Sequence, residues 1–190
     1  MKFDKFFALA KVKGLSQAQI QFGKNKSTSI KIFHHEIDNF SINDSQNIVA
    51  CGIYNGKFGS CRTEKLGRDT FDFLVNGIID SAKVNEKAET AELFKGSEKY
   101  NKKNVFVEGI ADIDIQKTID LMKGMENDLY AFDKRITEVD DVEYEEDETM
   151  SEFYNSFGLK LKQHSNYFYV VASAVAKQGE EIKTNYDVFL

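Results

Sequence analysis

Residues 47–66, NIVACGIYNGKFGSCRTEKL, decide how this chain begins to fold. They hold two runs of strand-forming residues separated by Asn55-Gly56, a dipeptide typical of a type I′ hairpin turn. A two-residue loop at this position sets the register of the hairpin. In that register Cys51 and Cys61 are offset by one pairing position, so their side chains point to opposite faces. The register therefore excludes a disulfide or a shared metal ion between the two thiols.

The strand pattern extends upstream of this hairpin. Apolar residues alternate with polar ones over 18–22 and again over 30–32, which is the period of a half-buried strand. Asn43-Asp44 is typical of a turn. We therefore expect residues 17–63 to form about four antiparallel strands in a meander.

Three stretches have the period of an amphipathic helix instead. Residues 3–13 carry a short apolar stripe, and Gly14 is placed to end the helix. Residues 71–82 and 114–133 carry longer stripes, wide enough to cover a sheet face. These stripes are Phe71, Leu74, Val75, Ile78, Ile79 and Ala82, and then Ile115, Ile119, Met122, Met125, Leu129 and Phe132.

The period of two returns after the third helix. We expect strands over 135–146, 150–154, 158–176 and 180–189. The sequence thus predicts an α+β fold class, with antiparallel or mixed β-sheet meanders packed against about three amphipathic helices. We expect 1–190 to be a single domain with two pseudo-equivalent halves, 1–83 and 112–190, joined by a linker at 84–111.

The composition excludes several classes of protein. The chain has 190 residues, and 42% of them are hydrophobic, so it is too apolar to be intrinsically disordered. No apolar run approaches the ~20 residues of a membrane-spanning helix, and the charged N-terminal sequence is unlike a secretory signal. A net charge of −6 argues against a groove that neutralises nucleic-acid phosphates. Two cysteines do not make a disulfide framework, which favours a reducing, cytoplasmic location.

The histidines do not have the spacing of a metal site. His34-His35-Glu36 resembles the beginning of a metallopeptidase helix, but no second histidine follows one helical turn later. The surrounding alternation predicts a strand, in which the two imidazoles point to opposite faces. We expect His34, His35 and His164 to be exposed strand residues, and we assign no residue as catalytic or as a metal ligand.

The segment from Glu138 to Glu152 is strongly acidic and contains neither Lys nor Arg. It lacks the glycine turn of a calcium-binding loop. We expect an edge strand and loop whose like charges repel other sheet edges. The alternative is a docking surface for a basic partner or a cationic peptide.

Three stretches, taken in order, resemble the TldD/PmbA family of metallopeptidases. Residues 47–66 and the helix after them are similar to the family signature G-x-x-V/I-Y-x-x-x-K/R-G-S/A-x-x-T-x-x-L. Residues 133–164, DKRITEVDDVEYEEDETMSEFYNSFGLKLKQH, resemble a family strand followed by an N-S-x-G hairpin, in wording closer to the PmbA (TldE) branch than to TldD. Residues 170–189, VVASAVAKQGEEIKTNYDVF, resemble the segment V-V-A-x-x-G-x-E-x-x-x-x-Y.

The resemblance implies an N-terminal domain of a longer, cytoplasmic metallopeptidase that acts in peptide maturation and proteolysis. The family's metal motif, H-E-x-x-x-H with a later Cys, belongs to TldD-type subunits and has no counterpart in these residues. We therefore expect no cofactor in this chain, zinc only in a TldD-type partner or a missing C-terminal region, and no hydrolase activity of this chain alone. The expected partners are a TldD-type subunit or a second copy, and a peptide substrate, with no nucleic acid and no membrane.

The N-S-x-G hairpin supplies the candidate substrate or interface residues, Asn155, Ser156 and Gly158. An extended peptide can add to the edge of an antiparallel sheet through main-chain hydrogen bonds. We expect the hairpin and its acidic neighbour to lie where such a peptide binds. The alternative function is that of a non-enzymatic acidic protein-interaction module.

Overall fold

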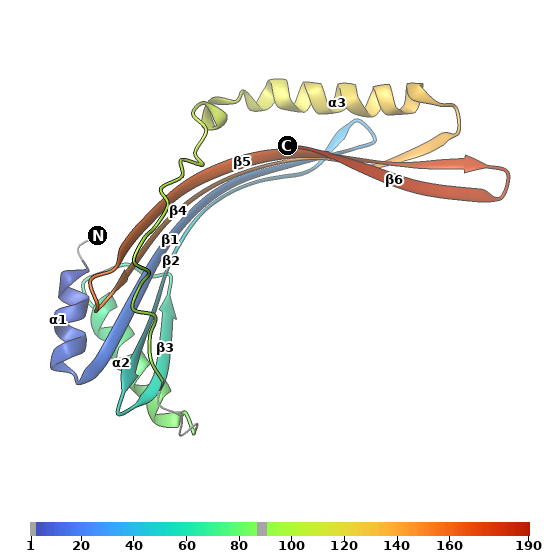
Figure 1. The fold of residues 1–190 in the computed structure, drawn as a ribbon. Helices are drawn as coiled ribbons and strands as arrows, with labels where there is room; N and C mark the ends of the chain where they lie inside the picture. The colour runs from blue at the N-terminus through green and yellow to red at the C-terminus, as the bar shows by residue number, and fades with distance from the viewer. Residues whose placement is uncertain (1–2, 87–90) are drawn as a thin grey trace. The chain divides into compact units, whose positions relative to one another are not determined.

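The computed structural model describes residues 3–86 and 91–190, which form three α-helices, a short 3-10 helix and six β-strands (Figure 1). The helices are α1 (Asp4–Val12), α2 (Thr70–Val84) and α3 (Ile115–Phe132), and the 3-10 helix is Ile110–Asp112. The strands are β1 (Leu15–Phe33), β2 (Glu36–Tyr54), β3 (Lys57–Thr63), β4 (Ile136–Asn155), β5 (Lys160–Gln178) and β6 (Glu181–Phe189). The predicted α+β class is confirmed.

The strands of the described residues form one sheet in the order β3-β2-β1-β4-β5-β6. Two-residue turns join β1 to β2, β2 to β3 and β5 to β6. β1 also runs antiparallel to β4 and the turn after it, as three contacts show. These contacts join Ala18 to Ser156, Asn25 to Asp147 and Lys31 to Asp141.

The β2–β3 hairpin has the register predicted from the sequence. Cys51 pairs with Ser60 and Cys61 pairs with Ala50, so the two thiols lie on opposite faces of the hairpin. Both cysteines are free, and burial raises the pKa of each thiol. Neither cysteine therefore has the low pKa of a nucleophilic thiolate.

Two hairpin turns have left-handed backbone at both central residues, as a type I′ turn requires. Asn55 and Gly56 have φ angles of 49° and 78°, which confirms the predicted turn. His34 and His35 have φ angles of 48° and 61° and form the turn between β1 and β2. The prediction that these histidines lie in a strand was wrong. Strand alternation continues up to them on both sides, and His-His lacks the glycine or asparagine that signals such a turn.

The strands are longer than the sequence predicts. Residues 17–63 contribute to three strands rather than about four, because the predicted turn at Asn43-Asp44 lies inside β2. The predicted strands 135–146 and 150–154 are likewise parts of the continuous β4. In both places, pairing with a long neighbouring strand outweighs the local preference of polar residues for turns.

The sequence predicts that the acidic segment lies at a sheet edge, and this prediction was wrong. The segment belongs to β4, which lies between β1 and β5 in the sheet. Its charges therefore cannot protect an outer strand from pairing. A position with neighbours on both sides instead lets residues of those strands contact the carboxylates.

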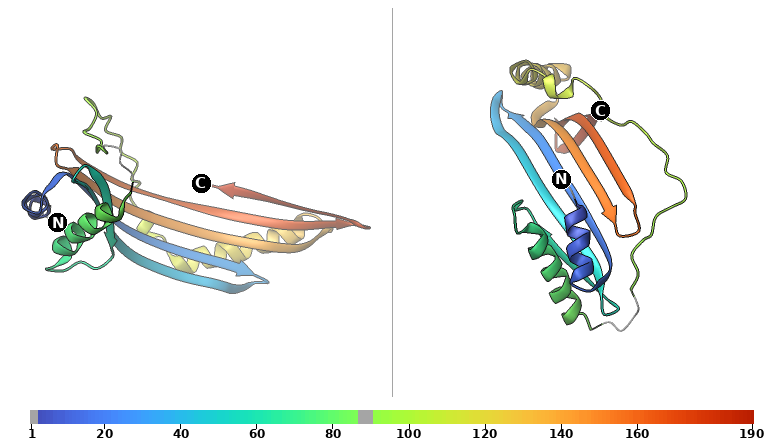
Figure 2. Two further views of the ribbon diagram at one scale, coloured as in Figure 1. Left: turned by 90° about the horizontal axis from the view of Figure 1, so that it is seen from below. Right: turned by 90° about the vertical axis from the view of Figure 1, so that its left-hand side faces the viewer.

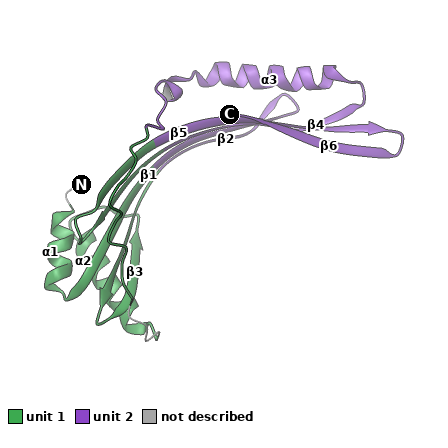
Figure 3. Ribbon diagram, in the orientation of Figure 1, with its two compact units in different colours: residues 1–24, 45–103, 149–164 green, residues 25–44, 104–148, 165–190 purple. Residues whose placement is uncertain are grey.

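The described residues form two compact units, shown in Figure 3. Unit 1 takes its residues from 1–24, 45–103 and 149–164, and unit 2 from 25–44, 104–148 and 165–190. Each unit thus contains residues from both sides of the segment 84–111. The sequence-based division into one domain with halves 1–83 and 112–190 stays a prediction.

In unit 1, α1 and α2 cover one face of the strands (Figure 2). Phe6 of α1 and Leu74 and Ile78 of α2 are fully buried against β1 and β2, which confirms the predicted stripes. Gly14 ends α1 with a φ of 88°, as predicted. At Gly59 of β3 an added Cβ would lie 2.0 Å from the carbonyl oxygen of Ile78, so glycine is what lets α2 approach β3 this closely.

In unit 2, α3 packs its apolar stripe on β1 and β4. Ile119 and Met122 are buried together with isoleucines of β1 and valines of β4. Asp114 caps the helix by accepting hydrogen bonds from the backbone N–H groups of residues 116 and 117. Phe132, which the sequence places on the packed stripe, is 84% exposed. It is the last residue of the helix, where the stripe runs past the core.

Among the described residues, no helix combines the length and apolar character needed to cross a membrane.

Candidate functional site

The predicted hairpin lines a groove in unit 1, next to α1. The groove has a volume of about 830 Å³, which is within the range of small-molecule and peptide pockets. It lies between α1, the start of β1 and the turn that follows β4. Its lining residues are Phe3, Asp4, Phe7, Ala10, Lys11, Leu15, Ser16, Ala18, Tyr154, Asn155, Ser156, Phe157, Gly158 and Lys160.

Asn155 holds the turn together. Its side chain is buried, and Oδ1 accepts hydrogen bonds from the backbone N–H groups of Phe157 and Leu159, each at 3.0 Å. Its Nδ2 donates to the carbonyl oxygen of Phe94 at 2.8 Å. Both the oxygen and the nitrogen of the Asn155 amide are thus bonded to the chain, and its role at this site is to shape the groove.

Ser156 and Gly158 complete the turn. The N–H of Ser156 donates to the carbonyl oxygen of Ala18 at 2.8 Å, and its Oγ accepts from the N–H of Ala18 at 3.1 Å. Gly158 has a φ of 91°, a left-handed conformation that favours glycine. The three predicted site residues thus come together at one end of the groove. Their role in binding a substrate or partner stays a prediction.

The exposed surface of the groove is formed by side chains that the sequence analysis did not identify. Phe157 is 42% exposed, and the ammonium of Lys95 lies 5.9 Å from the centre of its ring. Phe7, Lys11 and Lys160 line the same groove. The sequence predicts an apolar stripe over residues 3–13, which include Phe7, but no local pattern indicates that this stripe contacts a turn from residues 154–160.

A polar triad lies on β4 and β5 close to this turn. Glu152 accepts hydrogen bonds from the hydroxyl of Tyr154 at 2.7 Å and from Nζ of Lys162 at 2.8 Å. Burial alone would raise the pKa of Glu152, but the hydrogen bonds from Lys162 and Tyr154 outweigh it and lower that pKa. Glu152 is thus a stable anion that aligns the two strands.

The histidines of the β1–β2 turn pair with separate carboxylates. Nε2 of His34 lies 2.6 Å from Oε1 of Glu138, and Nδ1 of His35 lies 2.9 Å from Oε2 of Glu126. Glu126 is fully buried, and its Oε2 also accepts the backbone N–H of His35 at 2.7 Å. Across the part of the chain that the structure describes, no three His, Cys, Asp or Glu side chains gather as metal ligands.

The acidic residues of β4 are engaged by neighbouring strands. Lys31 of β1 pairs with Asp141 at 3.3 Å, and Asn25 donates to Asp147 at 2.6 Å. The hydroxyl of Tyr169 on β5 donates to Glu145, and this hydrogen bond raises the pKa of the tyrosine to about 12. Three carboxylates of this segment therefore have partners on neighbouring strands, and Asp141 is paired with a cation.

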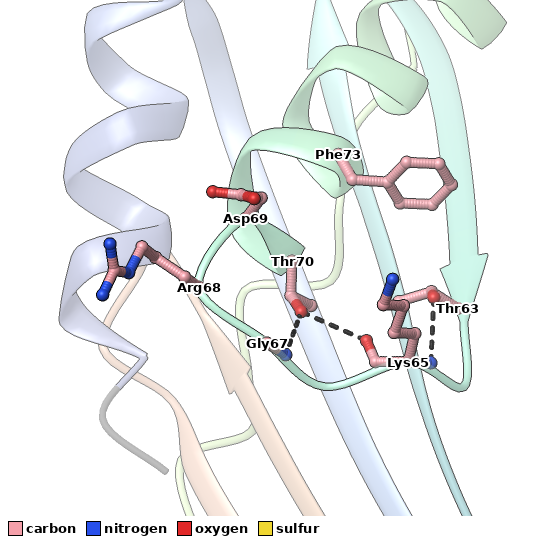
Figure 4. Close-up of a pocket in the computed structure, with 7 residues that line it drawn as sticks. All are labelled: Thr63, Lys65, Gly67, Arg68, Asp69, Thr70 and Phe73. Atoms are coloured by element: carbon pink, nitrogen blue, oxygen red, sulfur yellow. Dashed lines mark hydrogen bonds between the residues drawn. The ribbon is translucent and has the colours of Figure 1, made fainter.

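A second cavity in unit 1, of about 390 Å³, lies at the loop between β3 and α2 (Figure 4). The hydroxyl of Thr70 accepts from the N–H of Gly67 at 2.7 Å and donates to the carbonyl oxygen of Lys65 at 3.1 Å. Arg68 and Asp69 also line this cavity. It is smaller than the groove beside α1 and contains none of the predicted site residues.

A third cavity, of about 590 Å³, lies in unit 2. α3 contributes Met125, Leu129 and Phe132, and β5 contributes alanines. β6 forms the other side through residues 183–187 and 189.

Comparisons with known proteins agree with this fold. Residues 108–189 match the family model of the PmbA/TldA metallopeptidase central domain. The comparison with curated proteins gives no match. The matching model covers a central domain, so the N-terminal placement expected from the sequence stays a prediction.

Solved structures resemble nearly the whole chain. They include candidate modulators of DNA gyrase from Thermotoga maritima (20% identity, TM-score 0.83) and from Bacteroides thetaiotaomicron (19% identity, TM-score 0.84). A third is TldE from Thermococcus kodakarensis (17% identity, TM-score 0.81). The matches cover 97%, 97% and 98% of this chain but only 41%, 43% and 42% of those chains, so this chain spans less than half of each. The family match at residues 108–189 and the fold shared with TldE together support a TldD/PmbA-family domain in this chain.

Proposed function

We propose that this chain is a structural and substrate-guiding part of a TldD/PmbA-type metallopeptidase that acts in peptide maturation and proteolysis. The observation that carries the proposal is the family match at residues 108–189 together with a fold shared over nearly the whole chain with TldE. The groove beside α1 supplies a place for a peptide. A TldD-type subunit is the proposed enzymatic partner, and the cytoplasm is the proposed location.

The groove suits a short peptide segment that carries an apolar side chain. Phe3, Phe7 and Phe157 give it apolar walls, while Lys11 and Lys160 place positive charge at the same surface. An apolar pocket with a few charged groups can fix both the position and the direction of a bound chain. The groove can therefore hold a peptide while the chemistry takes place elsewhere.

Zinc has no ligand set among the described residues of this chain. His34 and His35 are each paired with a different carboxylate, and a catalytic zinc site needs three protein ligands around one open position. We therefore assign the zinc to a TldD-type partner or to further sequence of the longer protein. In this assignment the chain contributes binding and orientation, and no step of hydrolysis.

The alternative, a non-enzymatic acidic interaction module, has less support. Its argument depends on an accessible row of carboxylates between Glu138 and Glu152. Contacts with Lys31, Asn25 and Tyr169 already engage three of these carboxylates within the fold. These three carboxylates already have partners within the fold, which leaves fewer of them to bind a basic partner.

Site-specific crosslinking tests the groove. A photoreactive phenylalanine analogue is placed at Phe157 in the chain assembled with its TldD-type partner, and short fluorescein-labelled peptides of mixed sequence are added. We expect labelling at residue 157. The matched control is the same analogue at Phe58, another half-exposed phenylalanine of unit 1 that lies outside the groove.

Peptide cleavage by the same assembly gives a second measure. Phe157→Ala should raise KM while leaving kcat unchanged, because the variant loses a contact that binds the peptide but takes no part in the chemical step. Equal labelling at residues 58 and 157, or a normal KM in the variant, would show that peptides are guided by another surface.

A further inference from the structure

β6 is an edge strand with no neighbour on its outer side among the described residues. It pairs with β5 from Val170↔Phe189 to Gln178↔Glu181, and it is the last strand in the sheet order. All of its residues are exposed, including Ile182, Tyr186 and Val188. An edge of this kind presents unpaired N–H and C=O groups and is a template for another strand.

The sequence of β6, EIKTNYDVF, is self-complementary about its central residue, Asn185. When a second copy lies antiparallel with Asn185 opposite Asn185, Lys183 faces Asp187 and Ile182 faces Val188. Two-fold symmetry makes each of these pairs occur twice. Opposite charges and apolar side chains directly across an antiparallel pair stabilise it. The geometry points to β6 as the interface through which two copies of this chain join their sheets edge to edge.

The hydrogen-bonding pattern allows this register. Along an edge strand, alternate residues direct their backbone groups outward. In the register centred on Asn185, paired residues always differ by an even number of positions. Both members of each pair therefore direct their backbone groups the same way, as an antiparallel ladder requires.

The neighbouring allowed registers are less favourable. A register centred on Thr184 places Glu181 opposite Asp187, so like charges face each other twice. A register centred on Tyr186 places Asp187 opposite Asn185 and so leaves Asp187 without a cation across from it. The charges of β6 thus select the register centred on Asn185.

Lys183 has a competing contact within the chain. Its Nζ lies 2.8 Å from Glu181, and both side chains are largely exposed. An exposed ion pair of this kind contributes little, so it does not prevent Lys183 from reaching Asp187 of a second copy. The interface needs neither a metal nor a peptide, and it is independent of the proposed function.

Charge exchange across the interface tests the proposal. Sedimentation velocity on the full chain should show a concentration-dependent dimer. Lys183→Glu or Asp187→Lys should each weaken it about tenfold or more, because like charges then face each other twice. An equimolar mixture of the two single variants should restore dimers, since each chain then presents the charge that the other lacks. Lys5→Glu, which changes the same charge on exposed α1, should have no effect.

A disulfide reports the register directly. In a background with Cys51→Ala and Cys61→Ala, Asn185→Cys should crosslink across the two-fold axis. Its partner Cα would lie about 4.5–5.5 Å away, within the range of a disulfide. Lys183→Cys should not crosslink, because the two copies of residue 183 would lie roughly 14 Å apart. A monomeric chain, a dimer unaffected by both charge reversals, or failure of the mixture to restore dimers would each overturn the proposal.

Discussion

At the scale of single residues, Glu126 has the most unusual environment. It is a fully buried carboxylate on α3, and its Oε2 holds both the backbone N–H and the ring of His35. Its Oε1 is buried and makes no hydrogen bond in the structure. A buried acceptor that fixes a left-handed turn connects one helix to one hairpin through a single side chain.

Glu126→Ala should therefore destabilise the chain by about 1–3 kcal/mol, because the donors of His35 lose a buried acceptor. Glu126→Gln keeps an oxygen in place and should cost less. Urea unfolding measures both free energies. Asp128→Asn on the exposed side of the same helix is the control, and a loss as large in this control would show that the buried contact is unimportant.

Asp133 and Arg135 give a prediction for pH dependence. The guanidinium of Arg135 donates to both carboxylate oxygens of Asp133 and lowers its pKa from 3.8 to about 2. A lowered pKa in the folded state means that the pair stabilises the fold above pH 3.8, and that this contribution is lost as the pH falls through about 2.

In Arg135→Gln, the pKa of Asp133 should rise toward 3.8, followed by carbon NMR of the carboxyl group. It should not reach that value, because the backbone N–H of residue 135 still donates to the carboxylate. Arg62→Gln, which removes an exposed cation that is paired with Glu64 instead, should leave the pKa of Asp133 unchanged. An unchanged pKa in Arg135→Gln would contradict the assigned cause.

The candidate site shows what single residues could and could not predict. The Asn155–Gly158 turn was identified from its local N-S-x-G pattern, because turn chemistry depends on a few adjacent residues. The walls of its groove come from α1 and β1, which are far away in sequence. No local sequence pattern predicts the contact between these elements and the turn. The environment of Glu126 was missed for the same reason, since its partner is a turn that the sequence did not indicate.

At the scale of elements, two glycines allow a matched comparison. At Gly59 of β3 a Cβ would lie 2.0 Å from the backbone oxygen of Ile78 and 2.7 Å from the backbone nitrogen of Ala82. At Gly124 of α3 an added Cβ meets nothing within 4 Å. The same substitution therefore tests a crowded and an open position.

Gly59→Ala should destabilise unit 1 by about 1–3 kcal/mol, because α2 must move away from β3. Gly124→Ala should stabilise the chain by roughly 0.5–1 kcal/mol, since alanine favours a helix over glycine. Thermal unfolding of both variants checks the signs. A neutral Gly59→Ala would show that the helix and strand are not in close contact.

The helices and the Asn55-Gly56 hairpin were predicted well, whereas the His34-His35 turn and the strand lengths were not. A helix can be predicted from an apolar stripe within one segment of sequence. The Asn-Gly turn likewise predicts which residues of β2 and β3 pair with each other. The length of β2 and β4 depends on pairing with distant strands. The alternation of polar residues over 36–47 is too weak to predict that pairing, so the Asn43-Asp44 turn signal was given too much weight.

At the scale of the whole molecule, the proposed function predicts where zinc does not bind. After dialysis against micromolar zinc, the purified chain should hold far less than one zinc ion per chain by elemental analysis. The assembled complex with a TldD-type partner should retain zinc under the same conditions. One tightly bound ion per isolated chain would contradict the assignment of His34 and His35 to separate carboxylates.

The pairing of β1 with β4 has a consequence for folding kinetics. Residues 34–135 separate these two strands, whereas the other neighbours in the sheet are consecutive in the chain. Consecutive strands can pair progressively from a short turn. β1 and β4 must instead close a long loop, and the entropy lost in closing it precedes any stabilising contact between them. The docking of β1 on β4 is therefore the step expected to limit the refolding rate, and substitutions there should slow refolding more than those in the hairpins.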